Sequence, residues 1–278
     1  MIGHDDPRLS DRDGLARKLA EAARISAAVL LAKRAEPDVK LKRDGSPVCA
    51  ADLAADHAAK GALARLLPGF PVISEETADD GASSGAIFIL LDPLDGTREF
   101  LAGGDSYCVA IAVVRDGRPI AGAIAAPAMR RLWFAGTHAF TQDFGSDGAA
   151  TGEPRPASVR DLPAAGPVAL VSRFHGDTRS DGIAATMCCS EGIPVSSAVK
   201  FGLIASGEAD LHVRCGQTME WDIAAGDAIL SAAGGIVLTL DGARPRYGVS
   251  ERQFRNPPFV AASSEALARR AIAGDPGC

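Results

Sequence analysis

Two carboxylates and a hydroxyl stand close together in the first half of the chain, within residues 92–97 (DPLDGT). They follow an apolar run over residues 86–91, which is typical of a strand buried on both faces. The proline biases the preceding residue towards an extended backbone, and the glycine permits a tight turn. We therefore expect Asp92, Asp95 and Thr97 on a rigid turn at a strand end, where open α/β sheets place their ligands. Carboxylate and carbonyl oxygens there suit Mg²⁺; the alternative is an Asp-rich surface turn.

Two further carboxylates stand at the boundaries of other predicted elements. Glu75 ends a short apolar run over residues 70–74, and Asp222 begins a helical segment of small residues. A carboxylate at a helix start can hold a metal while the free backbone N–H groups favour a nearby phosphate. The alternative for Asp222 is a simple helix cap. Together with Asp92 and Asp95, these residues predict a multi-metal cluster.

The rest of the chain predicts the elements that must position this cluster. Strand-like runs over residues 107–114 and 119–126 flank Asp116-Gly117, which is a hairpin signal. Leu53, His57 and residues 63–67 are expected on the inner side of a helix over residues 51–67. Further helices are predicted over residues 10–33, 178–188, 200–206 and 222–233 and from Ser264, and further strands over 132–135, 168–171, 211–213, 235–240 and 259–262.

The alternation of strands and helices argues for layered α/β packing. Residues 143–163 are rich in Gly, Ala, Pro, Ser and Asp, and they are the best candidate for a domain junction. We expect an N-terminal α+β region over residues 1–145 that carries most metal ligands. A C-terminal α/β region over residues 164–278 would complete the metal and substrate site.

Composition narrows the classes of function. The chain has 278 residues, 47% of them hydrophobic, and a net charge of −6. Because no block of Lys and Arg is visible, we expect no nucleic-acid polymer as partner, whereas a small anionic substrate is compatible. The six cysteines show no metal-binding spacing and indicate reduced thiols. Without a signal-like or transmembrane run, the protein is expected in the cytoplasm, with peripheral attachment to the inner face of the membrane left open.

Three motifs in a fixed order resemble the signature of the Mg²⁺-dependent, lithium-sensitive phosphatases, the superfamily that contains inositol monophosphatase. They are Glu75-Glu76, residues 92–97 and residues 221–225 (WDIAA). Residues 98–100 (REF) and 172–175 (SRFH) resemble one subgroup, the CysQ-type 3′(2′),5′-bisphosphate nucleotidases. The order of that subgroup continues at Ser196-Ser197, Lys200-Phe201, Gly207 and Asn256-Pro257. The chain departs from the family at Cys49, where a threonine is usual, and this puts a small polar contact near Asp52 in doubt.

The resemblance implies an α-β-α-β-α layered sandwich and two or three Mg²⁺ ions. The metal ligands would be Glu75, Asp92, Asp95, Asp222 and the carbonyl oxygen of Leu94. Paired ions of this kind stabilise the attacking and leaving oxygens of an in-line displacement. Lithium would inhibit the activity through the second metal site.

The resemblance also implies the residues that act on the substrate. Thr97 would orient the attacking water, and Asp52 would act as base through Thr97 or the water; a helix cap is the alternative role for Asp52. Substrate contacts are expected from Lys200, His175, Arg173, Gly96 and Thr97. A solvated helix-face position is the alternative for Lys200. Surface or structural roles are the alternatives for His175 and Arg173.

The activity implied is hydrolysis of adenosine 3′,5′-bisphosphate to AMP and phosphate, which clears a by-product of sulfate activation. One alternative is an inositol-phosphate or other sugar-phosphate phosphatase. Another is a metal-dependent nucleotide binder without activity. The partner in each case is a small anionic nucleotide or sugar phosphate, and the protein would be a monomer or a homodimer.

Overall fold

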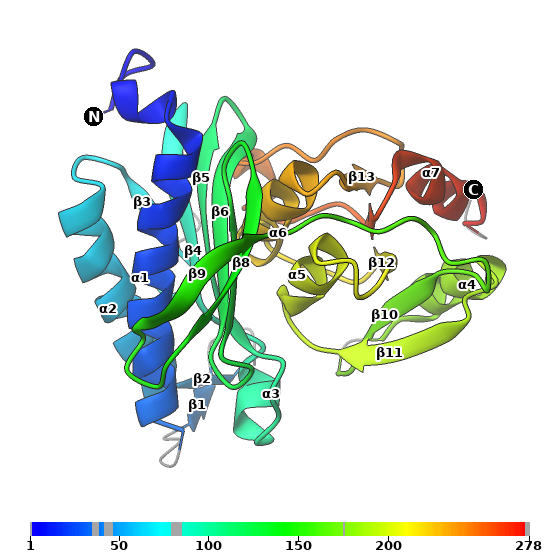
Figure 1. The fold of residues 1–278 in the computed structure, drawn as a ribbon, viewed down its shortest axis with the longest axis horizontal. Coiled ribbons are helices and arrows are strands. Elements are labelled where there is room, and N and C mark those ends of the chain that lie inside the picture. Colours follow the sequence, from blue (N-terminus) through cyan, green and yellow to red (C-terminus); the bar gives the residue numbers. More distant parts are fainter. Residues whose placement is uncertain (1, 35–38, 42–46, 79–84, 175, 276–278) are drawn as a thin grey trace.

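The computed structural model describes residues 2–34, 39–41, 47–78, 85–174 and 176–275. In this part of the chain, two large β-sheets alternate with three layers of helices, so that the order of layers is α-β-α-β-α (Figure 1), and a third sheet has only two strands. The layered α/β sandwich expected from the sequence is therefore confirmed. Among the described residues, no helix has the length and apolar character needed to cross a membrane.

Seven strands form the larger sheet, in the order β3-β4-β5-β6-β7-β8-β9. Their bounds are Val72–Ser74, Ile87–Asp95, Cys108–Arg115, Arg118–Ala126, Arg131–Ala135, Ala139–Phe144 and Ala150–Pro156. β3 and β4 run parallel, and the later neighbours pair antiparallel. The predicted hairpin joins β5 to β6. Asp116 and Gly117 both have positive φ, 53° and 74°, as a two-residue type I′ turn requires.

Helices α1 (Arg12–Ala32) and α2 (Ala50–Leu66) cover one face of this sheet (Figure 1). The prediction for the inner side of α2 was wrong for Leu53 and His57, which are exposed, and was confirmed for Leu63 and Leu67, which are buried. The helix instead buries a stripe of small residues, and this stripe allows a close approach to α1 and β4. The stripe consists of Ala51, Ala55, Ala59 and Ala62.

Five strands form the second sheet, in the order β11-β10-β12-β14-β13. Their bounds are Glu191–Val195, Val168–Ser172, Leu211–Arg214, Phe259–Ala262 and Ile236–Thr239. Helices α5 (Val199–Ala205) and α6 (Glu220–Ala232) lie between the two sheets, and α4 (Thr178–Thr186) and α7 (Glu265–Ala273) lie on the outer face of the second sheet (Figure 1).

Helix α6 lies against the larger sheet at Gly122 of β6. A Cβ at this position would lie 2.7 Å from the carbonyl oxygen of Ala225 and 2.9 Å from its Cα. Only glycine therefore allows α6 to come this close to the sheet. Because α6 carries Asp222 in its first turn, this contact sets the position of Asp222 relative to the strands.

Five strands of the described chain were not expected from the sequence: β1 (Val39–Leu41), β2 (Pro47–Cys49), β8, β9 and β11. β9 lies inside the candidate domain junction at residues 143–163, and β11 follows α4. The chain crosses to the second sheet only after β9, and the division into two domains stays a prediction. The remaining elements are η1 (Pro7–Leu9), α3 (Thr97–Leu101) and η2 (Ser250–Arg252).

Candidate active site

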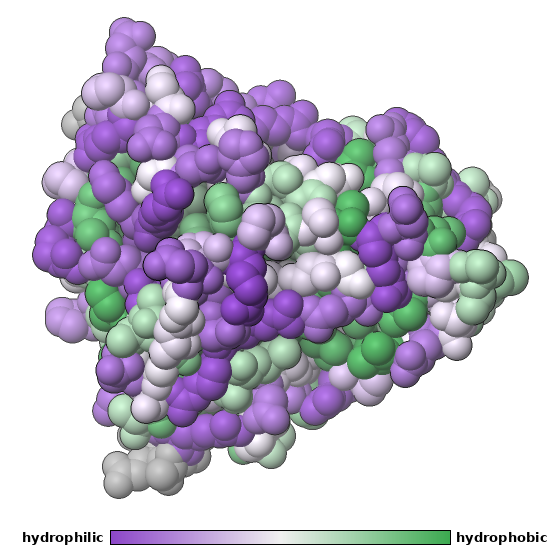
Figure 2. Space-filling model, in the orientation of Figure 1, coloured by the Kyte–Doolittle hydropathy of each residue, from purple (hydrophilic) through white to green (hydrophobic). Residues whose placement is uncertain are grey.

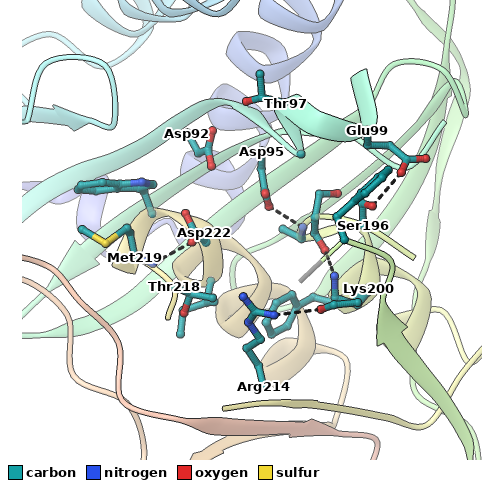
Figure 3. A pocket seen from close by; sticks show the side chains of 18 of the residues that line it. Asp92, Asp95, Thr97, Glu99, Ser196, Lys200, Arg214, Thr218, Met219 and Asp222 are labelled. Atoms are coloured by element: carbon teal, nitrogen blue, oxygen red, sulfur yellow. Dashed lines mark hydrogen bonds between the residues drawn. The ribbon is translucent and has the colours of Figure 1, made fainter. Parts of the chain in front are cut away.

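A pocket of about 310 Å³ lies at the carboxyl ends of β3 and β4 and faces α5, α6 and the second sheet (Figure 3). Parallel strands end at the same edge of a sheet, so Glu75 and the β4 turn come together there. Nine of the predicted site residues line the pocket: Glu75, Asp92, Leu94, Asp95, Gly96, Thr97, Arg173, Lys200 and Asp222. Asp52 lies behind Thr97, and His175 lies outside the described residues.

The turn at the end of β4 is an irregular strand end. Pairing with β5 is interrupted between Asp92 and Asp95, and such bulges re-aim side chains next to active sites. Asp92 is only 1% exposed and accepts a hydrogen bond from the Leu94 N–H at 3.0 Å. The interpretation as an Asp-rich surface turn is therefore wrong. Asp95 accepts from the Ala198 N–H at 2.6 Å, which ties the turn to the start of α5.

Asp52 and Asp222 occupy equivalent positions in two different helices. Each is the third residue of its helix, and its Oδ2 accepts from the backbone N–H of the N-cap residue. The donor is Cys49 for Asp52, at 2.7 Å, and Met219 for Asp222, at 2.8 Å. The capping role offered by the sequence is thus present in both. The capping hydrogen bond orients each carboxylate through Oδ2. The second oxygen, Oδ1, does not take part in this bond.

Thr97 connects the pocket to Asp52. Its hydroxyl lies 3.4 Å from Oδ1 of Asp52 and 3.2 Å from the carbonyl oxygen of Leu94. The Cys49 thiol donates to Oδ2 of Asp52 at 2.8 Å, so the contact that the missing threonine put in doubt is made by sulfur. Burial raises the pKa of Cys49 to about 11, and the hydrogen bond to Asp52 adds to the shift. The thiol therefore stays protonated as a donor.

The carboxylates in the pocket destabilise one another. Burial raises the pKa of Asp92 well above its ordinary value, and repulsion from Glu75 and Asp95 raises it further. Burial, followed by repulsion from Asp95 and Glu75, does the same to the pKa of Asp222. Burial raises the pKa of Asp95 to about 6, although the Lys200 charge acts in the opposite direction. A bound cation would relieve this repulsion.

The donor set fits a hard cation, since it consists of carboxylate and carbonyl oxygens with no thiolate or imidazole. Among the residues that the structure describes, no group of three or more His, Cys, Asp and Glu side chains is arranged to hold an ion as it stands. The assignment of individual metal ligands stays a prediction.

Lys200 lies beneath the pocket and not on a solvated helix face. It is 6% exposed, and its Nζ donates to the carbonyl oxygens of Val195 at 3.2 Å and Ser197 at 2.8 Å. Burial lowers its pKa to about 8, against the opposing effect of the Asp95 carboxylate. The ammonium group thus places positive charge on the side of the pocket opposite Asp92 (Figure 3).

Arg214, at the end of β12, is a second cation in the pocket that the sequence analysis did not select. It is 8% exposed, and its Nη2 donates to the carbonyl oxygen of Gln217 at 3.3 Å. Burial lowers its pKa, while Asp177 and Asp222 act in the opposite direction. The sequence did contain a signal, since a charged residue directly after the predicted strand 211–213 repeats the pattern of Asp92 after its own strand.

Glu99, the second residue of the REF motif, is the centre of a buried hydrogen-bond network. It is 1% exposed and accepts from the Ser196 hydroxyl at 2.8 Å and from Nη1 of Arg173 at 2.9 Å. Burial alone would raise its pKa, but the hydrogen bond from Ser196 and the neighbouring donors lower it overall. Arg173 also donates to the Pro194 carbonyl oxygen at 3.2 Å. The network joins α3 to the segment after β10 and to the end of β11.

The comparisons with known proteins agree with this architecture. The family model described as "Inositol monophosphatase family" matches residues 11–274. The chain is 35% identical to 3′(2′),5′-bisphosphate nucleotidase CysQ of Escherichia coli K12, over 80% of this chain and 87% of the relative. The crystal structure of CysQ from Bacteroides thetaiotaomicron has a TM-score of 0.74 and 28% identity, covering 89% of this chain and 96% of that one.

A further solved structure shares the fold at lower identity. Extragenic suppressor protein suhB from Bartonella henselae has a TM-score of 0.75 and 22% identity, and the match covers 95% of this chain and 99% of that one. The family model and the relatives span both sheets and the pocket between them. The chain therefore belongs to the inositol monophosphatase family.

Proposed function

We propose that this protein is a Mg²⁺-dependent phosphomonoesterase that hydrolyses adenosine 3′,5′-bisphosphate to AMP and phosphate in the cytoplasm. The observation that carries the proposal is one pocket with carboxylates on one side and cations on the other. Glu75, Asp92, Asp95 and Asp222 stand on the first side, and Lys200 and Arg214 on the second. The similarity to CysQ proteins named as 3′(2′),5′-bisphosphate nucleotidases supports the choice of substrate.

Two or three Mg²⁺ ions would be held by the four carboxylates and the Leu94 carbonyl oxygen. When bound, such ions polarise the phosphoryl oxygens and lower the pKa of a nearby water. The carboxylates themselves need no proton-transfer role. Their burial and mutual repulsion make a site that favours cations before any substrate arrives.

Thr97 and Asp52 are the chain's own means of handling the proton of the attacking water. Because the Thr97 hydroxyl donates towards Asp52 or the Leu94 carbonyl oxygen, its oxygen is free to accept a hydrogen bond from a water in the pocket. Asp52 has one oxygen occupied by Cys49 and one facing Thr97, so it is oriented to receive a proton through the threonine.

Lys200, Arg214 and Arg173 supply positive charge on the other side of the pocket. A bisphosphate substrate carries a second phosphate that is not cleaved, and arginine forms strong hydrogen bonds with phosphate oxygens. We assign this phosphate to Arg214 and Arg173, with Lys200 as a buried charge beneath them. Gly96 lines the pocket at the β4 turn, where its backbone would contact the cleaved phosphate.

Phosphate release tests the proposal directly. Purified protein in Mg²⁺ is given adenosine 3′,5′-bisphosphate or inositol 1-phosphate at matched low concentrations. We expect a strong preference for the nucleotide, inhibition by LiCl, and no release by Asp95→Asn. A preference for inositol 1-phosphate would overturn the substrate assignment, and nucleotide binding without any phosphate release would overturn the enzymatic one.

A further inference from the structure

Phe174 is an exposed aromatic residue at the rim of the active-site pocket. In the described part of the chain, four large hydrophobic side chains are exposed: Leu53, Met129, Leu162 and Phe174. Single exposed hydrophobic residues are common on protein surfaces and by themselves indicate nothing. Phe174 differs from the other three because it lines the pocket, and it is the one aromatic among them.

The other aromatic side chains that line the pocket are already packed. Phe201 and Phe259 are each 2% exposed, and their rings stack on each other with centroids 6.0 Å apart. Trp221 is 7% exposed and packs on Phe254, with ring centroids 5.9 Å apart. Phe174, in contrast, is 41% exposed. Among the described lining residues, only Phe174 therefore offers an aromatic face to a ligand.

The residue before Phe174 is held in place by the network around Glu99. Arg173 donates to Glu99 at 2.9 Å and to the Pro194 carbonyl oxygen at 3.2 Å. A residue that follows directly along the chain inherits part of this restriction. The backbone that carries the aromatic ring is thus anchored at the pocket rim on its N-terminal side. Anchoring reduces the conformational entropy that is lost when a ligand binds.

The position of Phe174 relative to the charges matches the shape of a nucleotide. The carboxylates lie on one side of the pocket, the cations lie opposite, and Phe174 follows one of these cations along the chain. In a nucleoside bisphosphate the reacting phosphate, the second phosphate and the flat aromatic base are attached to three different carbons of one ribose, so the base needs a contact of its own at the pocket rim. Aromatic side chains stack on nucleobases, and the contact tolerates any base because every base has a π-face.

We propose that Phe174 is the platform on which the nucleobase of the substrate stacks, so that this residue separates nucleotides from inositol and other sugar phosphates. The inference rests on the proposed function, because it concerns the same pocket. It differs from the substrate contacts that the family resemblance implied, which did not include Phe174. The ligand class it selects is a purine or pyrimidine nucleotide.

The test compares two ligands that differ only in the base. AMP and ribose 5-phosphate are titrated into the Mg²⁺-loaded protein by calorimetry, and the ratio of their dissociation constants is taken for each variant. In the wild type we expect AMP to bind more tightly. Phe174→Ala should reduce the ratio by about 5- to 30-fold, Phe174→Leu should reduce it nearly as much, and Phe174→Trp should keep it.

Leu162→Ala is the matched control, since Leu162 is 42% exposed but does not line the pocket. It should leave the ratio unchanged. An unchanged ratio in both Phe174→Ala and Phe174→Leu, or equal binding of the two ligands by the wild type, would overturn the inference. Phosphate release by the wild type, measured in parallel, separates the two proposals. If the nucleotide is hydrolysed but the ratio does not respond to Phe174, only the base platform fails.

Discussion

Cys49 supports Asp52 through both its backbone N–H and its thiol. Removing the thiol in Cys49→Ala should lower kcat by about 5- to 10-fold, because one hydrogen bond of about 1 kcal/mol that orients the carboxylate is lost. The KM should change little, since Cys49 does not line the pocket. Steady-state kinetics check this, with Cys188→Ala at an exposed position as control. Cys49→Ser and Cys49→Thr should keep activity, and a Cys49→Ala variant with unchanged kcat would contradict the role.

Asp95 makes the protein without Mg²⁺ less stable at neutral pH. Its folded-state pKa of about 6 lies above the ordinary 3.8. Below about pH 4 the carboxyl is protonated in both states and costs no stability. The cost grows as the pH rises and is complete above about pH 6. Asp95→Asn should therefore be more stable than the wild type by about 1 to 2 kcal/mol at pH 7, a value reduced for water in the pocket. The gain should shrink to zero as the pH falls to 4.

Chemical denaturation of both proteins in EDTA, at intervals from pH 4 to pH 8, measures this difference. The comparison cancels the titrating groups that do not interact with Asp95, such as the buried His212, whose pKa is lowered by burial. A gain that is constant across the range would show that the carboxylate charge is not its cause. The same variant should release no phosphate. The carboxylate cluster thus lowers the stability of the metal-free protein while it is needed for activity.

Residues that form one short motif could be predicted from the sequence, whereas residues joined across the fold could not. Asp92, Asp95 and Thr97 stand within six residues and were placed at the pocket correctly. Glu99 and Arg173 are 74 residues apart, so neither type nor spacing indicates that they pair. The burial of Lys200 also follows from tertiary packing of α5, which a short helical pattern does not report.

At the scale of elements, the β4 turn depends on a close contact with the loop before α5. Gly96 has φ of +90°, and a Cβ there would lie 3.3 Å from both Cβ of Ser197 and Cα of Tyr107. Gly69 has φ of +86° with open space around it, so it is a matched control. Gly69→Ala should cost about 1 kcal/mol for the backbone conformation alone.

Gly96→Ala should cost about 2 to 3 kcal/mol, because crowding adds to the backbone strain. It should also lower kcat/KM at least tenfold, since the displaced turn carries Asp95 and Thr97. Thermal unfolding and kinetics of the two variants check this. Equal losses of stability and unchanged activity in both would mean that the turn tolerates the contact.

Two of the strands missed by the sequence analysis, β9 and β11, lie at sheet edges, whereas β8 lies between β7 and β9. β9 is largely exposed and contains Gly152, Pro154 and Pro156, and β11 is an exposed strand with Gly192 and Pro194. Edge strands can contain proline because one side of the strand makes no ladder hydrogen bonds. Their composition therefore resembles a loop. Buried central strands such as β4 and β5 were predicted, because an uninterrupted apolar run is typical of them.

At the scale of the whole molecule, the pocket is assembled from parts that are distant in the sequence. The β4 turn supplies Asp92 and Asp95 from the larger sheet, and α6 supplies Asp222 from between the sheets. The hydrogen bond from the Ala198 N–H to Asp95 joins the turn to α5. A cation shared by these carboxylates would link the layers of the fold. Its binding should therefore stabilise the whole protein and not only the pocket.

Mg²⁺ should accordingly raise the melting temperature. At an ion concentration 100 times the dissociation constant, the gain is about 2.7 kcal/mol, or about 5 to 10 °C for a chain of this size. Differential scanning calorimetry at constant ionic strength, with NaCl replacing MgCl₂ in the reference, measures the shift.

Asp95→Asn should remove most of the Mg²⁺-dependent shift, because the substitution removes a ligand and the repulsion that the ion relieves. Asp227→Asn should keep it, since Asp227 is a buried carboxylate bonded to Tyr247 away from the pocket. A shift of equal size in Asp95→Asn would place the ion elsewhere in the molecule and would separate metal binding from the site proposed for catalysis.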